Sequence, residues 1–402
     1  MLKLAFRNVF RQRLRSALTL AAVGAGVAAL ILAAGFVHDA LLQLREAVIR
    51  SQLGHLQVHK AGSAAGGGHA GASFIDEPGA VVALIDGAPH VTAVLQRVSF
   101  SGLLGNGRTE LPVIGEGVEP GREARLGSSL TIVAGRQLTD GDLDGVLVGE
   151  GLAQALRLRP GDRVTILAGS RDGALNTLDL AVIGVFRSFS RDFDSAAVRL
   201  PLSAAQELLV TDGVGALVIS LDDTANTLPA QRWLAGRLSG TGLEIRTWEE
   251  LADFYRATRD LYERQFAVLQ FIILILVVFG VSSSVNMSAF ERAGEFGTMM
   301  AAGARRRAVS LLLLAENFLL GLIGAAAGAL MGVAAASAIS AVGIPMPPPP
   351  NSAAGYTAFI RVVPAEVAWA CVIGVAAVML AAVLPAFRVP RLPIVEALRR
   401  NV

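Results

Sequence analysis

Residues 291–307, ERAGEFGTMMAAGARRR, place charged side chains and glycines between two long apolar runs. Three kinds of residue in this segment can contact another surface: hydrogen-bonding charges, apolar side chains, and glycines that permit close approach or end a helix. They are Glu291, Arg292 and Glu295, then Phe296, Met299 and Met300, then Gly297 and Gly303. The alternative interpretation is a solvated loop whose charges only fix the topology of the chain.

The apolar run that follows is itself interrupted by Glu316 and Asn317, in LLLLAENFLL. An ionisable group inside a membrane span is costly and is a candidate functional residue by default. Glu316 lies about two turns into the helix, so it can face inward and pair with an arginine of the 305–307 cluster at the cytoplasmic boundary. We favour a structural or coupling role for Glu316, and a proton relay is the alternative.

Further along the same run, Gly324, Gly328 and Gly332 recur every four residues and line one face of a helix. Such a stripe permits the close approach of a neighbouring helix. That neighbour can belong to this chain or to another one.

The sequence lacks the motifs of several kinds of catalysis. A P-loop needs a lysine after a glycine-rich turn, and neither Lys3 nor Lys60 follows one. No G-x-S-x-G elbow is present. His55 and His59 have the spacing of a helical metal pair, but the pattern around them is β-rich. We therefore expect no enzyme activity, no cofactor and no metal in this chain, and the net charge of +2 is too small to indicate nucleic acid.

Composition indicates which elements hold these residues. Of 402 residues, 53% are hydrophobic and 17% are charged, which is too apolar for a soluble domain of this size. Four runs are long enough to cross a membrane, whereas residues 54–246 have ordinary globular composition. The sequence predicts an α-helical membrane protein with four transmembrane helices and a large α+β extracytoplasmic domain.

Basic residues orient the predicted spans. They crowd the first sixteen residues, the end of the 291–307 loop and the C-terminal tail. The positive-inside rule puts all three in the cytoplasm, which four spans satisfy and five do not. The predicted segments are the basic N-terminus 1–16, transmembrane helices 17–37, 267–288, 308–342 and 364–386, stalk helices 38–53 and 247–266, the external domain 54–246, the cytoplasmic segment 289–307, the external proline-rich loop 343–363 and the tail 387–402.

The external domain consists mainly of short β-rich segments separated by turn dipeptides such as Asn106-Gly107 and Pro160-Gly161. The predicted strands are HLQVHK, TAVLQRVSFSGLL, ELPVIGEGV, GVLVG, DRVTIL, LDLAVIGVF, AAVRLPL and GALVISL, and helices are expected near 150–158, 203–209 and 228–238. Amphipathic helices flank the domain, and we interpret them as a stalk, with two unrelated surface helices as the alternative. Residues 61–73 are expected to form a mobile loop, and the proline run a stiff strut.

Motifs spread over almost the whole chain resemble the four-span ABC transporter permeases typified by MacB, FtsX and the lipoprotein-releasing pair LolC and LolE. Residues 291–307 are similar to the family's E-R-x-x-E-[IF]-G-T-x-x-A-x-G-A loop, and LPAFRVPRLPIVEALR is similar to its C-terminal tail. Three stretches of the external domain look closest to the LolC and LolE branch: GVLVGEGLAQALRLRPGDRVTIL, AVIGVFRSFSRDFDSAAVRLPLSAAQELL and EIRTWEEL.

The resemblance implies that residues 291–307 form a coupling helix that docks on a separate cytoplasmic ATPase, which binds ATP and Mg. It also implies a second permease, identical or homologous, and a bacterial inner-membrane location with both termini in the cytoplasm. Movement would pass up the stalk and drive release or export of a lipoprotein or other hydrophobic substrate. Membrane lipid and a periplasmic adaptor or lipoprotein carrier are further partners. The alternative is an FtsX-like regulator that activates a periplasmic partner such as a cell-wall hydrolase.

Overall fold

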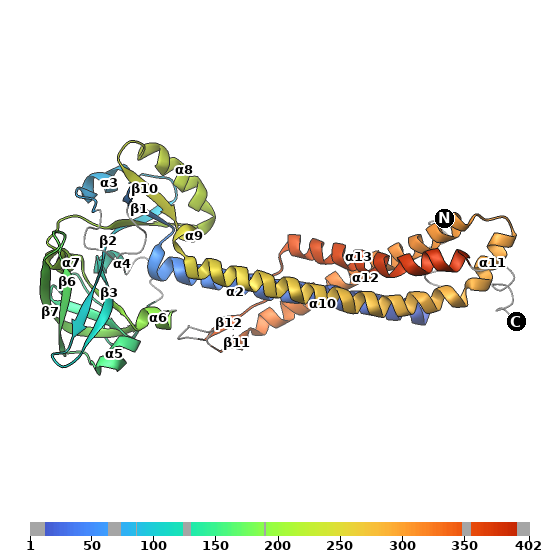
Figure 1. Cartoon of the computed structure of the whole chain (residues 1–402), viewed down its shortest axis with the longest axis horizontal. Helices are drawn as coiled ribbons and strands as arrows, with labels where there is room; N and C mark the ends of the chain where they lie inside the picture. The colour runs from blue at the N-terminus through green and yellow to red at the C-terminus, as the bar shows by residue number, and fades with distance from the viewer. Residues whose placement is uncertain are drawn as a thin grey trace. The chain divides into compact units, whose positions relative to one another are not determined.

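A computed structural model describes residues 13–62, 74–85, 87–123, 130–188, 190–347 and 355–391 (Figure 1). The chain divides into two compact units. Unit 1 comprises residues 1–42, 259–345 and 357–402, and unit 2 comprises residues 43–258 and 346–356. The extreme N-terminus, most of the glycine-rich stretch, most of the proline run and the end of the C-terminal tail lie outside the described residues.

Long helices dominate unit 1. They are α2 (Arg13–Val48), α10 (Asp253–Glu291), α12 (Arg306–Val342) and α13 (Pro364–Arg388), with the short α11 (Ala293–Ala301), the 3₁₀ turn η4 (Val389–Arg391) and the paired short strands β11 (Ile344–Met346) and β12 (Tyr356–Ala358). Among the described residues, these four long helices are long and apolar enough to cross a membrane. The run at 308–342 is therefore one helix, as the basic residues predicted. The elements α2, α10, β11 and β12 each contribute residues to both units.

The helices of unit 1 pack through small and β-branched side chains. Val23 and Val27 of α2, Val281 of α10, and Ala377 and Val378 of α13 belong to one buried cluster. Ridges of such residues let helices approach closely where no water is present to drive association. The outward side chains of α10 are large and exposed, among them Phe271, Leu276 and Phe279.

A mixed ten-stranded sheet forms the centre of unit 2, in the order β10-β1-β9-β2-β3-β8-β5-β7-β4, with β6 against β2 and β7. The strands are β1 (Leu56–Lys60), β2 (Val91–Gly105), β3 (Glu110–Val118), β4 (Thr131–Gly135), β5 (Gly145–Gly149), β6 (Arg163–Gly169), β7 (Leu175–Arg187), β8 (Ala197–Pro201), β9 (Ala216–Leu221) and β10 (Leu243–Thr247). The β3–β8 and β5–β7 pairs are parallel and the others are antiparallel. Each of the eight predicted strand segments contains a strand, whereas β4 and β10 were not predicted.

Helices cover this sheet at several points. They are α3 (Pro78–Ile85), α4 (Pro120–Glu123), α5 (Glu150–Leu156), α6 (Arg191–Asp194), α7 (Leu202–Leu209), α8 (Thr227–Arg237) and α9 (Trp248–Leu251), with the π-helix η1 (Ile49–Leu53) and the 3₁₀ turn η3 (Thr224–Asn226). The predicted helices near 150–158, 203–209 and 228–238 correspond to α5, α7 and α8.

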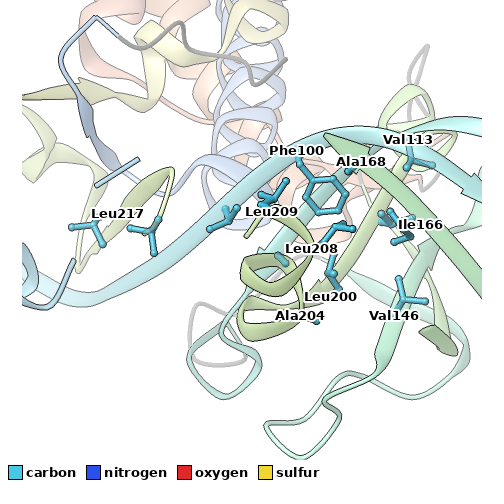
Figure 2. Close-up of a cluster of buried hydrophobic side chains, with 14 of the residues drawn as sticks. Phe100, Val113, Val146, Ile166, Ala168, Leu200, Ala204, Leu208, Leu209 and Leu217 are labelled. Atoms are coloured by element: carbon cyan, nitrogen blue, oxygen red, sulfur yellow. The ribbon is translucent and has the colours of Figure 1, made fainter. Parts of the chain in front are cut away.

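The core of unit 2 lies between the sheet and α7 (Figure 2). Leu200 of β8, Ile166 of β6 and Leu208 of α7 are completely buried there. The ring of Phe100 lies directly over Gly115, its partner on β3, where a Cβ atom would come within 2.0 Å of the ring. A glycine is therefore required opposite Phe100.

One end of unit 2 gathers the chain segments that adjoin the membrane helices. Val48 and Ile49, at the end of α2 and the start of η1, pack with Trp248 of α9 and with Ala252 and Tyr255. The rings of Trp248 and Tyr255 meet edge to face, with centroids 5.0 Å apart. Within unit 2, the segments that precede and follow the domain thus pack on each other.

Candidate functional site

The short helix α11 lies between two of the membrane-length helices. Arg292 separates it from α10, and Gly303 follows its end with a φ of +95°. The amide of Gly303 donates to the carbonyl of Met300 over 3.0 Å. A side chain at Gly303 would find open space, so the backbone conformation rather than crowding favours glycine there.

The two faces of α11 differ in exposure. Phe296 and Met300 are buried, 1% and 9% exposed, in a cluster with Ala289, Val309, Leu313, Ala386 and Val389. Gly297 is buried as well, whereas Met299 is 36% exposed and Glu291 is exposed. The apolar contact surface suggested for Phe296, Met299 and Met300 must be corrected, because only Met299 is accessible. Phe296 and Met300 are four residues apart, a spacing typical of one helix face, and this spacing was the sequence signal that both are buried on the same side.

Arg292 ties α11 to the interior of the helix bundle. Its guanidinium donates to both carboxylate oxygens of Glu316, over 2.6 and 3.3 Å, and Nε donates to Glu295 over 3.1 Å. It also lies 5.0 Å from the centre of the Phe296 ring. Burial alone would lower the pKa of Arg292, but Glu316 and Glu295 outweigh it, so the pKa is raised and the charge is kept.

The partner of Glu316 is therefore not the arginine predicted from the sequence. Arg305, Arg306 and Arg307 are exposed, whereas the side chains of Arg292 and Glu316 are 12% and 7% exposed. Arg292 lies 24 residues before Glu316, and only the reversal of the chain at α11 brings the two together. Sequence reasoning could place Glu316 inside the bundle but could not choose among the arginines at its boundary.

A small polar cavity of about 40 Å³ adjoins this ion pair within unit 1. Its polar lining comes from three helices: Ser16 and Thr19 of α2, Ser284 and Ser288 of α10 with Arg292, and Glu316 and Asn317 of α12. The hydroxyls of Thr19 and Ser284 are 2.8 Å apart, and the amide of Asn317 donates to the carbonyl of Leu313 over 2.8 Å. The Thr19–Ser284 contact joins α2 to α10, and Arg292, directly after α10, bonds to Glu316 of α12 at the end of the bundle that carries α11.

The glycine stripe of α12 packs against α2 of the same chain. A Cβ on Gly324 would lie 3.0 Å from Val23, and one on Gly332 would lie 3.1 Å from the backbone of Ala28. At Gly328 it would lie 2.6 Å from the carbonyl oxygen of Gly24. These positions leave almost no room for a side chain, so the two backbones meet directly.

A polar connection that sequence reasoning missed lies elsewhere in unit 1. Asp39 of α2 is fully buried, and its carboxylate accepts from the Phe359 amide over 2.9 Å and from Arg361 Nε over 2.8 Å. The amide of Arg361 also donates to the carbonyl of Gly35 over 3.3 Å. The acid at the end of the apolar run GFVHD was the available signal. This latch fixes the segment before α13 onto α2.

No group of three or more His, Cys, Asp and Glu side chains is arranged to hold a metal ion among the residues that the structure describes. His55 instead accepts at Nδ1 from the Leu221 amide over 3.0 Å, and His59 bonds to Gln57 over 2.9 Å.

These features define an integral membrane protein with a large α+β domain between its first and second membrane helices. Residues 16–236 match the family model of the MacB-like periplasmic core domain, and residues 267–394 match that of the FtsX-like permease C-terminal region. The chain belongs to the family of MacB/FtsX-type ABC transporter permeases.

Solved structures give weaker likenesses. They include the extracellular domain of the noncanonic ABC-type transporter YknZ from Gram-positive bacteria, at 14% identity, a TM-score of 0.35, and coverage of 48% of this chain and 99% of that one. The periplasmic region of MacB from Actinobacillus actinomycetemcomitans has 14% identity and a TM-score of 0.36, over 52% and 95% of the chains. A domain of a putative permease from Porphyromonas gingivalis has 16% identity and a TM-score of 0.30, over 49% and 89%. No curated protein sequence gives a significant match.

Proposed function

We propose that this chain is the membrane subunit that couples ATP hydrolysis by a separate cytoplasmic ATPase to movement of its extracytoplasmic domain. That movement drives release or export of a lipoprotein or another hydrophobic substrate. The observation that carries the proposal is the two-sided environment of α11, which has one face anchored in the helix bundle and another open to solvent.

The open side of α11 offers the contacts that a docking partner needs. Thr298 and Met299 are exposed on the helix, and Phe290 and Glu291, at the end of α10, are exposed just before it. Gly303 ends the helix after less than three turns. A short helix with an exposed methionine and an adjacent carboxylate fits a groove that has an apolar floor and a basic rim.

The buried face of α11 would transmit a force applied to this helix to the rest of the helix bundle. Phe296 packs on residues of α12 and η4, and Arg292 is bonded to Glu316 in α12. Because buried packing and a buried ion pair resist local deformation, α11 cannot move without α12. The chain itself then needs no bound nucleotide, and ATP and Mg belong to the ATPase.

The remaining parts of the proposal follow from the family and the basic segments. Two permeases, identical or homologous, supply two coupling helices to two ATPase subunits. The basic segments support, through the positive-inside rule, an orientation with both termini and α11 in the cytoplasm and unit 2 outside it. The family supports a bacterial inner membrane as the location and the periplasm as the compartment of unit 2. A periplasmic adaptor or lipoprotein carrier can reach unit 2 at a groove of about 670 Å³. That groove has charged side chains at Arg122 and Asp140 beside the exposed Leu143.

The test is the Met299→Ala variant of the chain, co-purified with its ATPase and reconstituted in lipid. We expect ATPase subunits to bind more weakly and substrate-stimulated ATP hydrolysis to fall several-fold, while membrane insertion is unchanged. Met331→Ala is the matched control, because Met331 is also an exposed methionine, on α12. Equal ATPase binding and equal stimulated hydrolysis in the two variants would remove α11 as the docking helix.

A further inference from the structure

The chain enters the sheet of unit 2 through the π-helix η1 rather than through a loop. The amide of Gly54 donates to the carbonyl of Ile49 over 2.8 Å, and the next residue, His55, donates to Ile219 of β9 over 2.9 Å. Gly54 has a φ of +63°, and a Cβ atom there would lie 2.4 Å from Val218. The connection from α2 to β1 therefore consists of η1 and two hydrogen-bonded residues, with no extended loop. π-Helices are rare and are frequently found at functional sites.

A buried arginine holds this π-helix against the sheet. Arg199, on β8 and 2% exposed, donates from Nη2 to the carbonyl of Ser51 over 2.8 Å. Its Nε donates to Glu116 of β3 over 2.9 Å, and the two residues are register partners of the parallel β3–β8 pair. Ser51 is fully buried. Arg199 therefore connects the turn that follows α2 to two adjacent central strands.

A second buried arginine of the same sheet provides a comparison. Arg97 on β2 is 4% exposed and donates to Glu123 of α4 over 2.6 Å. Arg97 and Arg199 thus share burial, a glutamate partner and a place in the sheet. Arg97 bonds to Glu123 on α4, whereas Arg199 reaches the backbone of η1.

We propose that η1 is the joint at which movement of the first membrane helix enters unit 2, and that Arg199 is the positioning residue that fixes its register. This inference rests on the proposed function and assigns the joint that the coupling requires. A π-turn holds one residue more than an α-turn, so its conversion to α-helix advances the following chain by about 1.5 Å and turns it by about 100°. The Arg199–Ser51 hydrogen bond opposes that conversion.

The geometry explains why an arginine suits this position. Its planar fork can bond a carbonyl and a carboxylate at once, which a lysine cannot do with the same precision. A charge-assisted hydrogen bond away from water is also among the stronger polar contacts in proteins. The joint therefore keeps one register until a force from α2 exceeds what this contact holds.

The first experiment measures amide hydrogen exchange on the full chain in lipid nanodiscs, comparing Arg199→Met with Arg97→Met. Loss of the charge-assisted contact should speed exchange at residues 49–55 by about 10- to 100-fold in Arg199→Met. Exchange there should be unchanged in Arg97→Met. Glu116→Gln, which keeps Arg199 and its packing, should give an intermediate increase if Arg199→Met fails to fold. Equal exchange at 49–55 in the two arginine variants would overturn the role of Arg199.

The second experiment adds ATP and Mg to the chain purified with its ATPase subunits and follows exchange in α11 and in β1. We expect nucleotide to change both in the native chain, and Arg199→Met to keep the change in α11 but lose it in β1. A β1 response that persists in full in Arg199→Met refutes the joint. A native chain without a response in α11 refutes the proposed function itself, and the joint with it, so the two failures can be told apart.

Discussion

The ion pair between Arg292 and Glu316 is the contact on which the anchoring of α11 depends most. Glu316→Leu leaves Arg292 buried with the half-exposed Glu295 as its remaining ion-pair partner among the described residues. Removing one member of a buried pair costs about 3–5 kcal/mol, and the remaining contact to Glu295 keeps the expected loss near the lower end. A loss of about 3 kcal/mol corresponds to a roughly hundredfold larger population in which α11 is detached.

Amide hydrogen exchange of residues 293–301 in nanodiscs measures that detachment. Glu316→Gln keeps an acceptor for Arg292 and should increase exchange only about fivefold, because it loses about 1 kcal/mol. Glu263→Leu, a substitution of an exposed glutamate on α10, is the control and should have no effect.

The most discriminating variant of this experiment removes both members of the ion pair by combining Arg292→Leu with Glu316→Leu. Replacing a whole buried pair with apolar side chains is often neutral, so exchange in α11 should return most of the way to the native rate. If the free-energy loss in the double variant equals the sum of the losses in the two single variants, the anchoring of α11 is not due to the ion pair. If Glu316→Leu exchanges within about twofold of the native chain, less than the change expected even for Glu316→Gln, the reasoning is refuted.

Three further outcomes follow from described contacts. Gly328→Ala should lower the midpoint of thermal unfolding of the detergent-solubilised chain by the equivalent of about 1–3 kcal/mol, because the new Cβ would meet the Gly24 backbone. Gly280→Ala is the control, because a Cβ there has open space, and it should leave the midpoint unchanged. Equal midpoints in the two variants would contradict the packing of Gly328 against α2. Asp39→Leu should lower the same midpoint by more than Asp39→Asn, since leucine can accept from neither Phe359 nor Arg361, and identical midpoints would count against the latch. Burial lowers the pKa of His55 below its ordinary value of 6.5, so the unfolded chain binds the proton more readily. The stability that neutral His55 contributes to unit 2 is fully present above pH 6.5 and is lost as the pH falls from there through the folded pKa. Urea titrations should show a smaller loss of unfolding free energy at low pH in His55→Asn than in the native chain. The same dependence of unfolding free energy on pH in both chains would exclude the effect.

Much of the fold could be predicted because it depends on local pattern. Four apolar runs predicted four long helices, and short β-rich segments between turn dipeptides predicted eight strands. The strands β4 and β10 were not predicted. TIVAG is mostly exposed, and LEIRT is a five-residue segment that is half-buried up to the buried Thr247, although its apolar and polar residues alternate. A strand at the edge of a sheet is defined by its neighbour more than by its own sequence.

The candidate site was predictable only in part, because its contacts join distant segments. Pattern alone gave Glu316 an inward position, and the glycine stripe a close neighbour. The choice of Arg292 over Arg305 depends on how the chain turns at α11, and the choice of α2 as the neighbour of Gly328 depends on the bundle. Asp39 and Arg361 lie 322 residues apart in the sequence, so no local pattern could pair them.

The entry and exit strands of unit 2 are neighbours. β1 pairs with β10 in antiparallel register from Leu56 opposite Thr247 to Lys60 opposite Leu243. A fold whose two ends meet in one hairpin-like pair can be inserted into, or removed from, a host chain without displacing the host's own elements. Chimaeras that exchange the segment bounded by β1 and β10 should therefore leave the membrane helices able to fold.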